Sequence, residues 1–125
     1  NIKRISLDQN KYLNLNKIIL PYEFVKNYIK IINKKNKNIF LNFNLEIKKN
    51  TFEVNKNGCR LPNDNVIGFA IALCHYSEPK KIYFAGFDGY DQKDALQSES
   101  ENYLKFLSKK SKYKLNFITK TKYNL

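Results

Sequence analysis

Apolar residues fall along the chain in short runs separated by polar segments. Runs of four to six residues rich in Ile, Leu, Phe and Tyr are typical of β-strands. They lie at 2–7, 17–20, 39–43, 51–54, 81–85 and 113–118. The run at 81–85 (Lys-Ile-Tyr-Phe-Ala) has the continuous apolar character of a central parallel strand, so we expect it in the middle of a sheet.

Longer segments with helical character lie between the predicted strands. Apolar residues at helical spacing predict an amphipathic helix over 22–33. Residues 66–76 are almost entirely apolar, which predicts a buried helix. The Gly- and Pro-containing stretch 57–64 predicts a loop before it, with Asn63 or Asp64 as the N-cap.

The order of these segments predicts an α/β domain. A Ser-Glu-Ser-Glu capping box at 98–101 predicts the start of a further helix before the last strand. Strands alternating with helices at these lengths predict βαβ crossovers. We therefore expect a three-layer Rossmann-like fold, a mostly parallel sheet with helices on both faces, forming one domain over 1–125. The chain contains no Met, so we expect it to be part of a longer protein.

The charge of the chain is large but unevenly distributed. The 125 residues carry 23 basic and 11 acidic side chains, a formal net charge of +12, yet only Arg4 and Arg60 are arginines. Residues 1–50 carry a net +8 and residues 103–125 a net +7, whereas residues 51–102 carry a net −3. Because nucleic-acid recognition relies on the forked guanidinium of Arg, this Lys-rich periphery does not favour a nucleic-acid partner.

The aromatic residues do not favour a nucleic-acid surface either. Most of them fall at core periodicities, and only Phe87, Tyr90 and Tyr123 gather near one predicted edge. A single-stranded nucleic acid needs a platform of exposed aromatic rings. No apolar run approaches the roughly 20 residues of a membrane-spanning helix, so we expect no membrane span.

The two cysteines, Cys59 and Cys74, bear on compartment and on metal binding. Two cysteines do not make a disulfide framework in a chain of this size, and neither has the spacing of a zinc ligand. We therefore expect a reducing, cytoplasmic setting. Cys59 beside Arg60 is either a thiol of lowered pKa or a structural or ligand-contacting side chain. Cys74 is expected in the core.

Three loops are expected to meet at one edge of the sheet, where parallel folds bind ligands. Residues 86–90 follow the predicted central strand, residues 119–121 follow the last strand, and residues 58–63 precede a helix N-terminus that suits a phosphate or carboxylate near Arg60. The ligand contacts predicted from these loops are Gly58, Cys59, Arg60, Asn63, Gly86, Phe87, Asp88, Gly89, Tyr90, Thr119 and Thr121.

Asp88 is the candidate catalytic residue. Gly86 and Gly89 flank it and predict a tight turn that projects its carboxylate from a strand end. There it could accept from a ribose hydroxyl, bind a metal or act as a general base, or it could hydrogen-bond its own turn. Five carboxylates over 88–101 are better explained as a solvated loop and a helix start than as a metal site. No dinucleotide or triphosphate motif is present, so the cofactor is unknown.

His75 is the only histidine, so any histidine-dependent chemistry must use it. It falls near the end of a predicted buried helix, away from the strand ends. A structural role there is favoured over catalysis, because a cation near a helix C-terminus complements the helix dipole.

Several short segments resemble a known bacterial domain. These segments are Phe52-Glu53, 58–63, Ala70-Ile71-Ala72 and Lys81-Ile82-Tyr83-Phe84-Ala85-Gly86-Phe87-Asp88-Gly89-Tyr90. In that order and spacing they resemble the C-terminal domain of proteins whose N-terminal TIM barrel is like HMG-CoA lyase and 4-hydroxy-2-oxovalerate aldolase. Such proteins are associated with surface-polysaccharide synthesis. The family pattern continues with a Gln and a Thr-x-Thr tail, which Gln97 and residues 119–121 match, and this adds Gln97 to the ligand contacts.

A weaker likeness is to the C-terminal half of bacterial sialyltransferases that use CMP-sialic acid. These share an apolar helix followed by a strand that ends in Gly-x-Asp. They place a catalytic His after that Asp, whereas residues 89–103 contain none.

The resemblances imply an accessory domain that binds a nucleotide sugar or acidic sugar for an aldolase- or lyase-like barrel outside this chain. The domain by itself is not expected to be catalytic. Two alternatives remain open at this point: an assembly or docking module, which would fit a homo-oligomer, and a fragment of a CMP-sugar-dependent glycosyltransferase.

Overall fold

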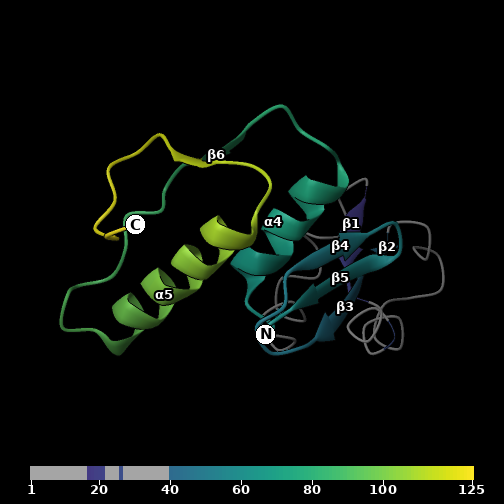
Figure 1. Ribbon diagram of the computed structural model, residues 1–125, viewed down its shortest axis with the longest axis horizontal. Helices are drawn as coiled ribbons and strands as arrows, with labels where there is room; N and C mark the ends of the chain where they lie inside the picture. The colour runs from purple at the N-terminus through teal and green to yellow at the C-terminus, as the bar shows by residue number, and fades with distance from the viewer. Residues whose placement is uncertain (1–16, 22–25, 27–39) are drawn as a thin grey trace.

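The computed structural model describes residues 17–21, 26 and 40–125, which form short strands and two helices (Figure 1). The predicted strand at 2–7 and all but one residue of the predicted helix at 22–33 lie outside the described residues. No described helix has the length and apolar character needed to cross a membrane.

The first five described strands form the N-terminal sheet region. β1 (Ile18–Leu20) pairs in parallel with β2 (Phe40–Asn42). β5 (Gly58–Leu61) lies between β3 (Asn44–Ile47) and β4 (Glu53–Asn55), parallel to β3 and antiparallel to β4.

Only Phe43 separates β2 from β3. The amide of Phe43 donates to the carbonyl of Leu20 (3.2 Å), and the next amide, of Asn44, donates to the carbonyl of Asn57 (3.1 Å). Successive amides of an extended chain point to opposite edges, so β1 and β5 flank opposite edges of this stretch.

α4 (Val66–Tyr76) has the bounds that its apolar run predicts. Its N-cap is Asn65, whose side chain accepts from the Ile67 amide, so the prediction of Asn63 or Asp64 as the cap is wrong. Asn63 lies two residues before this cap, and its side chain accepts a hydrogen bond from the Asn65 amide (3.2 Å).

α5 (Ala95–Lys110) begins earlier than the predicted capping box. Asp94 is the N-cap and accepts from the Leu96 amide (2.9 Å). The box at 98–101 lies within the helix, where Ser98 donates to the Ala95 carbonyl, so this helix-start prediction is wrong.

β6 (Ile82–Phe84) and β7 (Leu115–Phe117) form the C-terminal sheet. They pair in parallel, with α5 connecting them along the chain, and so make one βαβ unit of the predicted kind. Phe84 and Phe117, paired in register, stack with ring centroids 5.1 Å apart.

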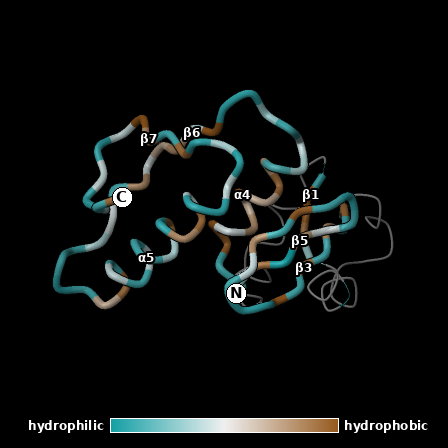
Figure 2. The backbone as a smooth tube through the Cα atoms, viewed as in Figure 1, coloured by the Kyte–Doolittle hydropathy of each residue, from teal (hydrophilic) through white to brown (hydrophobic). Residues whose placement is uncertain are grey.

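α4 lies at the centre of the described fold, between the N-terminal sheet and α5 (Figure 1). Its Ile71 belongs to a core cluster with α5, β6 and β7, whereas the adjacent Ala72 packs in a cluster with Phe43 and Leu61 of the N-terminal sheet region. An almost uniformly apolar helix is thus buried on two sides. Figure 2 shows hydrophobic residues along α4 and the strands, and hydrophilic residues along the loops.

The predicted three-layer Rossmann-like fold is wrong. The described strands form small sheets of two or three strands, in mixed and parallel arrangements. Tyr83, in the middle of β6, is 57% exposed, whereas Ile82 and Phe84 on either side are buried. A central strand of a three-layer fold is covered on both faces. The alternation along β6 means that only one of its faces is covered.

The predicted loop at 57–64 is also wrong in part, because its first half is β5, the middle strand of the three-stranded sheet. Gly58 begins this strand where it passes close to β3. A Cβ at this position would overlap the carbonyl oxygen of Asn44. The glycine that indicates a turn in the sequence therefore permits a close approach of two strands.

Candidate functional site

The loop at 86–90, directly after β6, forms one wall of a pocket of about 320 Å³. The first turn of α4 and the C-terminal tail complete it. The lining residues are Ile67, Gly86, Phe87, Asp88, Gly89, Tyr90 and Tyr123. All five predicted contacts from 86–90 thus lie together at one pocket.

The backbone of this loop is held by the C-terminal tail. The Gly86 amide donates to Thr119 Oγ1 (3.1 Å), and the Lys122 amide donates to the Asp88 carbonyl (2.8 Å). Gly86 and Gly89 have φ angles of 72° and 88°, which glycine adopts without the steric cost of a Cβ. The loop therefore has a defined shape that depends on both glycines.

Gln97, in the first turn of α5, joins the loop to the tail. Its Oε1 accepts from the Tyr90 amide (2.8 Å), and its Nε2 donates to the Lys122 carbonyl (3.1 Å). The side chain is buried and does not line the pocket. Gln97 thus supports the loop from behind, whereas the resemblance implies contact with a ligand.

The Asp88 carboxylate forms no hydrogen bond or ion pair with any residue that the structure describes, and it is exposed. Only its backbone carbonyl takes part in the turn. The nearby Asp91 differs, because Lys122 Nζ lies 2.9 Å from its Oδ1 and this hydrogen bond lowers the pKa of Asp91. Asp88 is therefore an available acceptor on the pocket wall.

Thr119 and Thr121 support backbone turns and are not among the lining residues. Thr119 holds Gly86, and Thr121 Oγ1 accepts from the Tyr123 amide (3.2 Å). Tyr123 lines the pocket and is otherwise buried, although the ligand contacts predicted from the sequence omit it. The sequence signal for Tyr123 was that it gathers with Phe87 and Tyr90 near one predicted edge of the sheet.

Of the four contacts predicted from residues 58–63, Gly58, Cys59 and Arg60 lie elsewhere, in the sheet of β3, β4 and β5. Asn63, the fourth, accepts from the Asn65 amide before α4 and does not line the pocket at 86–90. Arg60 is opposite Glu46 on one neighbouring strand and Glu53 on the other. Its Nε lies 2.6 Å from Glu46 Oε2 and its Nη1 3.2 Å from Glu53 Oε2. Both hydrogen bonds raise the pKa of Arg60, and its charge is neutralised within the sheet.

Cys59 is not a reactive thiol in this structure. Cys59 is 4% exposed and packs in the core cluster that includes Phe43 and Leu61. Burial raises its pKa from 9.0 to about 11, the opposite of an activated thiol.

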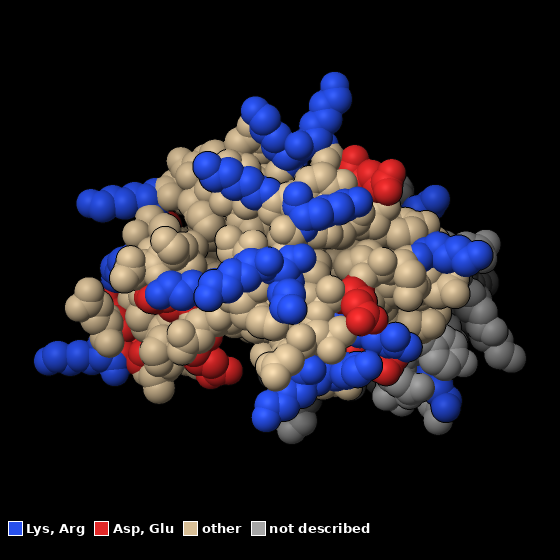
Figure 3. Space-filling model, in the orientation of Figure 1, with Lys and Arg blue, Asp and Glu red and all other residues tan. Residues whose placement is uncertain are grey.

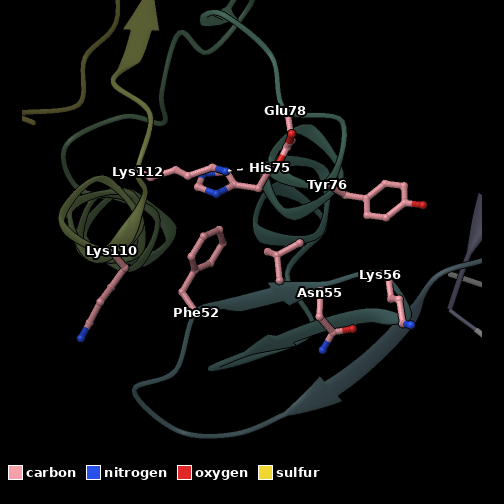
Figure 4. Close-up of a pocket in the computed structure, with 9 residues that line it drawn as sticks. Phe52, Asn55, Lys56, His75, Tyr76, Glu78, Lys110 and Lys112 are labelled. Atoms are coloured by element: carbon pink, nitrogen blue, oxygen red, sulfur yellow. Dashed lines mark ion pairs between the residues drawn. The ribbon is translucent and has the colours of Figure 1, made fainter.

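A second pocket, of about 440 Å³, lies at the C-terminal ends of α4 and α5 (Figure 4). Its lining residues are Phe52, Val54, Asn55, Lys56, His75, Tyr76, Glu78, Lys110 and Lys112. Sequence reasoning missed this pocket because its lining comes from separate segments, and lysines are too frequent in the chain to indicate a site. His75 is therefore both largely buried and part of a pocket wall.

Among the described residues, no group of three or more His, Cys, Asp or Glu side chains is placed to hold a metal ion. Several carboxylates of 88–101 have other partners: Asp91 pairs with Lys122, Asp94 caps α5, and Glu101 pairs with Lys105.

Comparisons of the chain with protein-family models, with curated proteins and with solved structures found no match.

Proposed function

We propose that the pocket at 86–90 binds a sugar or nucleotide sugar, with Asp88 as the acceptor for its hydroxyl groups. The observation that supports this most directly is the contrast within the loop. Its backbone is tied to Thr119, Gln97 and Lys122, yet the one carboxylate on the pocket wall has no partner among the described residues.

The lining suits a ligand with hydroxyl groups and a flat apolar face. A carboxylate can accept hydrogen bonds from two adjacent hydroxyls. Tyr90 and Tyr123 offer aromatic surface with hydroxyl groups at the ring edge, and Ile67 adds apolar contact. A volume of about 320 Å³ lies at the lower end of the range of small-molecule sites.

The position of α4 supports a ligand that also carries phosphate. Ile67 is in the first turn of α4, so the positive end of the helix dipole adjoins the pocket. The sugar of a nucleotide sugar would lie at Asp88 and its phosphates toward α4. In this proposal the domain is an accessory ligand-binding part of an aldolase-like protein of surface-glycan synthesis, and Asp88 holds the ligand.

Isothermal calorimetry of the chain with CMP, UDP and their sugars tests the proposal. We expect binding that Asp88→Asn weakens about tenfold, because a hydrogen bond to a charged group is replaced by a neutral one. Glu99→Gln removes an exposed carboxylate from α5 outside the pocket and should leave the affinity unchanged.

Two results would overturn the proposal. One is the absence of heat with every one of these compounds. The other is an affinity that falls equally in the Asp88 and Glu99 variants, because the loss would then come from overall charge and not from the pocket.

A further inference from the structure

The C-terminal sheet has one covered face and one exposed face. Both helices lie to one side of it (Figure 1), where Ile82, Phe84 and Leu115 pack in the core cluster. On the other face Tyr83 is 57% exposed and Ile118, directly after β7, is 64% exposed. Parallel sheets normally have both faces covered. The exposed face is therefore a candidate interaction surface.

The strand register arranges the outward side chains in three opposed pairs. Tyr83 is opposite Asn116. The Ile118 amide donates to the Phe84 carbonyl (2.9 Å), so the pairing continues beyond the last residue of β7. Successive side chains of a strand point to opposite faces. The same register, continued by one residue at each end, gives the outer face the pairs Lys81 and Lys114, Tyr83 and Asn116, and Ala85 and Ile118.

The two lysines of this outer face have no internal partner of opposite charge. Lys81 and Lys114 are exposed, and neither forms an ion pair with a residue that the structure describes. Like charges directly opposite each other on neighbouring strands are destabilising. The pair therefore costs stability in the chain alone, and a negatively charged surface against it would offset that cost.

Positive charge also extends well beyond the outer face. Residues 103–125, which include β7, contain seven lysines and no acidic residue. Lys80 adds a further positive charge just before β6. Figure 3 shows Lys and Arg more widely spread than Asp and Glu over the face it presents. Charge that is spread in this way complements an extended anionic surface better than a compact acidic partner.

The apolar part of the outer face is flat and small. Asn116 is held against the sheet, because its Nδ2 donates to the carbonyls of Ile82 and Lys114 (3.0 Å each). Only Tyr83 and Ile118 among the six outward residues are large and apolar. A typical protein interface buries about 800 Å² of each partner around an apolar core. A lipid surface requires less, since tyrosine suits the headgroup region and lysines are attracted to anionic lipids.

We propose that the outer face of the C-terminal sheet binds the surface of an anionic lipid bilayer. Tyr83 and Ile118 lie at the headgroup boundary, and Lys81 and Lys114 lie against the lipid phosphates. The contact is peripheral and uses a sheet face, so it requires no membrane-spanning helix. It is independent of the sugar site proposed at Asp88.

The chain contains no Trp, so a single introduced Trp reports the environment of its own position. We would mix Tyr83→Trp with vesicles of phosphatidylcholine and with vesicles of equimolar phosphatidylcholine and phosphatidylglycerol, at an ionic strength of about 150 mM. We expect its emission to shift to shorter wavelength with the anionic vesicles only. Val66→Trp is the matched control, at an exposed position of α4, and its emission should not shift.

Cosedimentation of the chain with the same anionic vesicles tests the individual side chains. Lys81→Gln and Lys114→Gln should each weaken binding about fivefold. Ile118→Ser should also weaken it about fivefold, because less apolar surface is buried. The controls are Lys56→Gln, in the turn after β4, and Val66→Ser, and both should bind as the wild type does. Asp88→Asn should leave vesicle binding intact, so this test and that of the proposed function can fail separately.

Four results would overturn the proposal. The first is no binding to the anionic vesicles, and the second is equal binding to phosphatidylcholine alone, because the lysines would then have no role. The third is an equal loss from Lys56→Gln and Lys81→Gln with none from Ile118→Ser, which would mean diffuse attraction to a basic protein. The fourth is a Tyr83→Trp emission shift with poly-L-glutamate as large as that with vesicles, because the face would then fit an acidic polypeptide.

Discussion

The phenol of Tyr103 in α5 ends against Gly68 in α4, where the two helices of the core meet. A Cβ on Gly68 would overlap the Tyr103 hydroxyl. That hydroxyl is buried and has no hydrogen-bond partner among the described residues, and burial raises the pKa of Tyr103 to about 12. The Tyr103 hydroxyl therefore lies at a close contact between the two helices but forms no stabilising hydrogen bond with the described residues.

We expect opposite effects from changing the two residues. Gly68→Ala should lower the free energy of unfolding by about 1–3 kcal/mol, because the added methyl group overpacks the contact. Tyr103→Phe should leave stability unchanged or raise it by up to about 1 kcal/mol, because the desolvated hydroxyl is removed and the ring retained. Urea unfolding followed by far-UV circular dichroism measures both.

The double variant is the decisive control for this contact. Gly68→Ala with Tyr103→Phe should recover part of the loss, since the overlapping oxygen is absent. Tyr83→Phe, at an exposed position of β6, should change nothing. A loss from Tyr103→Phe larger than about 1 kcal/mol would mean that the hydroxyl has a partner after all.

Gln97 offers a prediction about the loop at the proposed sugar site. Gln97→Leu removes both the acceptor of the Tyr90 amide and the donor to the Lys122 carbonyl. We expect a loss of about 1–3 kcal/mol in the free energy of unfolding, because these backbone groups lose their partner in a half-buried setting. We also expect faster hydrogen exchange of the Tyr90 amide.

The matched control for Gln97 is Gln92→Leu, five residues earlier at an exposed position. It should affect neither stability nor exchange at Tyr90. Exchange at Tyr90 that is the same in wild type and Gln97→Leu would contradict the supporting role of Gln97.

Cys59 gives a chemical prediction. With a pKa of about 11 in place of 9.0, its thiolate fraction near pH 8 is about 100-fold smaller than that of an ordinary thiol, and burial adds a steric barrier. In a Cys74→Ser variant, Cys59 should react slowly with Ellman's reagent in buffer and rapidly in urea. Equal rates in the two solutions would contradict its burial.

The elements predicted correctly are those whose structure depends mainly on residues close together in the sequence. The apolar run 66–76 defines α4 to the residue, and the short runs at 17–20 and 113–118 contain β1 and β7. The parallel pairing of β6 with β7 also follows from a helix between two strands.

The errors arose where distant partners decide the structure. β5 was predicted as a loop because Gly58 and Pro62 are typical of turns, and only the two strands beside it make it the middle of a sheet. The start of α5 depends on which of two possible caps the preceding chain presents, Asp94 or the later serine. The number of strands in each sheet has no local signal at all, and the Rossmann-like prediction failed for that reason.

The same distinction applies to the sites. The loop 86–90 is one continuous segment, so its grouping was predictable, and Tyr123 joins it only through the fold. Arg60 was expected to be available to an anion, but its register opposite Glu46 and Glu53 neutralises it. Tertiary pairing of this kind cannot be inferred from one sequence.

His75 makes a prediction about the pH dependence of stability. Its pKa is lowered in the folded protein, chiefly by burial and secondarily by Lys112, so the folded state binds a proton less readily than the unfolded chain. The contribution of the neutral His75 ring to stability is fully present above its pKa in the unfolded chain, near 6.5. It is lost as the pH falls through its lower pKa in the folded protein. The charged groups around the ring are Lys112, Lys110, Lys56 and Glu78.

We therefore expect a lower urea midpoint at pH 5.5 than at pH 7.5, a window above the ordinary pKa range of carboxylates, about 4. His75→Gln keeps an amide that can donate to Ser111 but does not titrate, so its midpoint should be the same at both pH values, apart from small contributions of other groups. A wild type and variant with parallel pH dependence would show that another group is responsible. An increase in wild-type stability toward pH 5.5 would mean that the fold stabilises the protonated ring, contrary to its buried position beside Lys112.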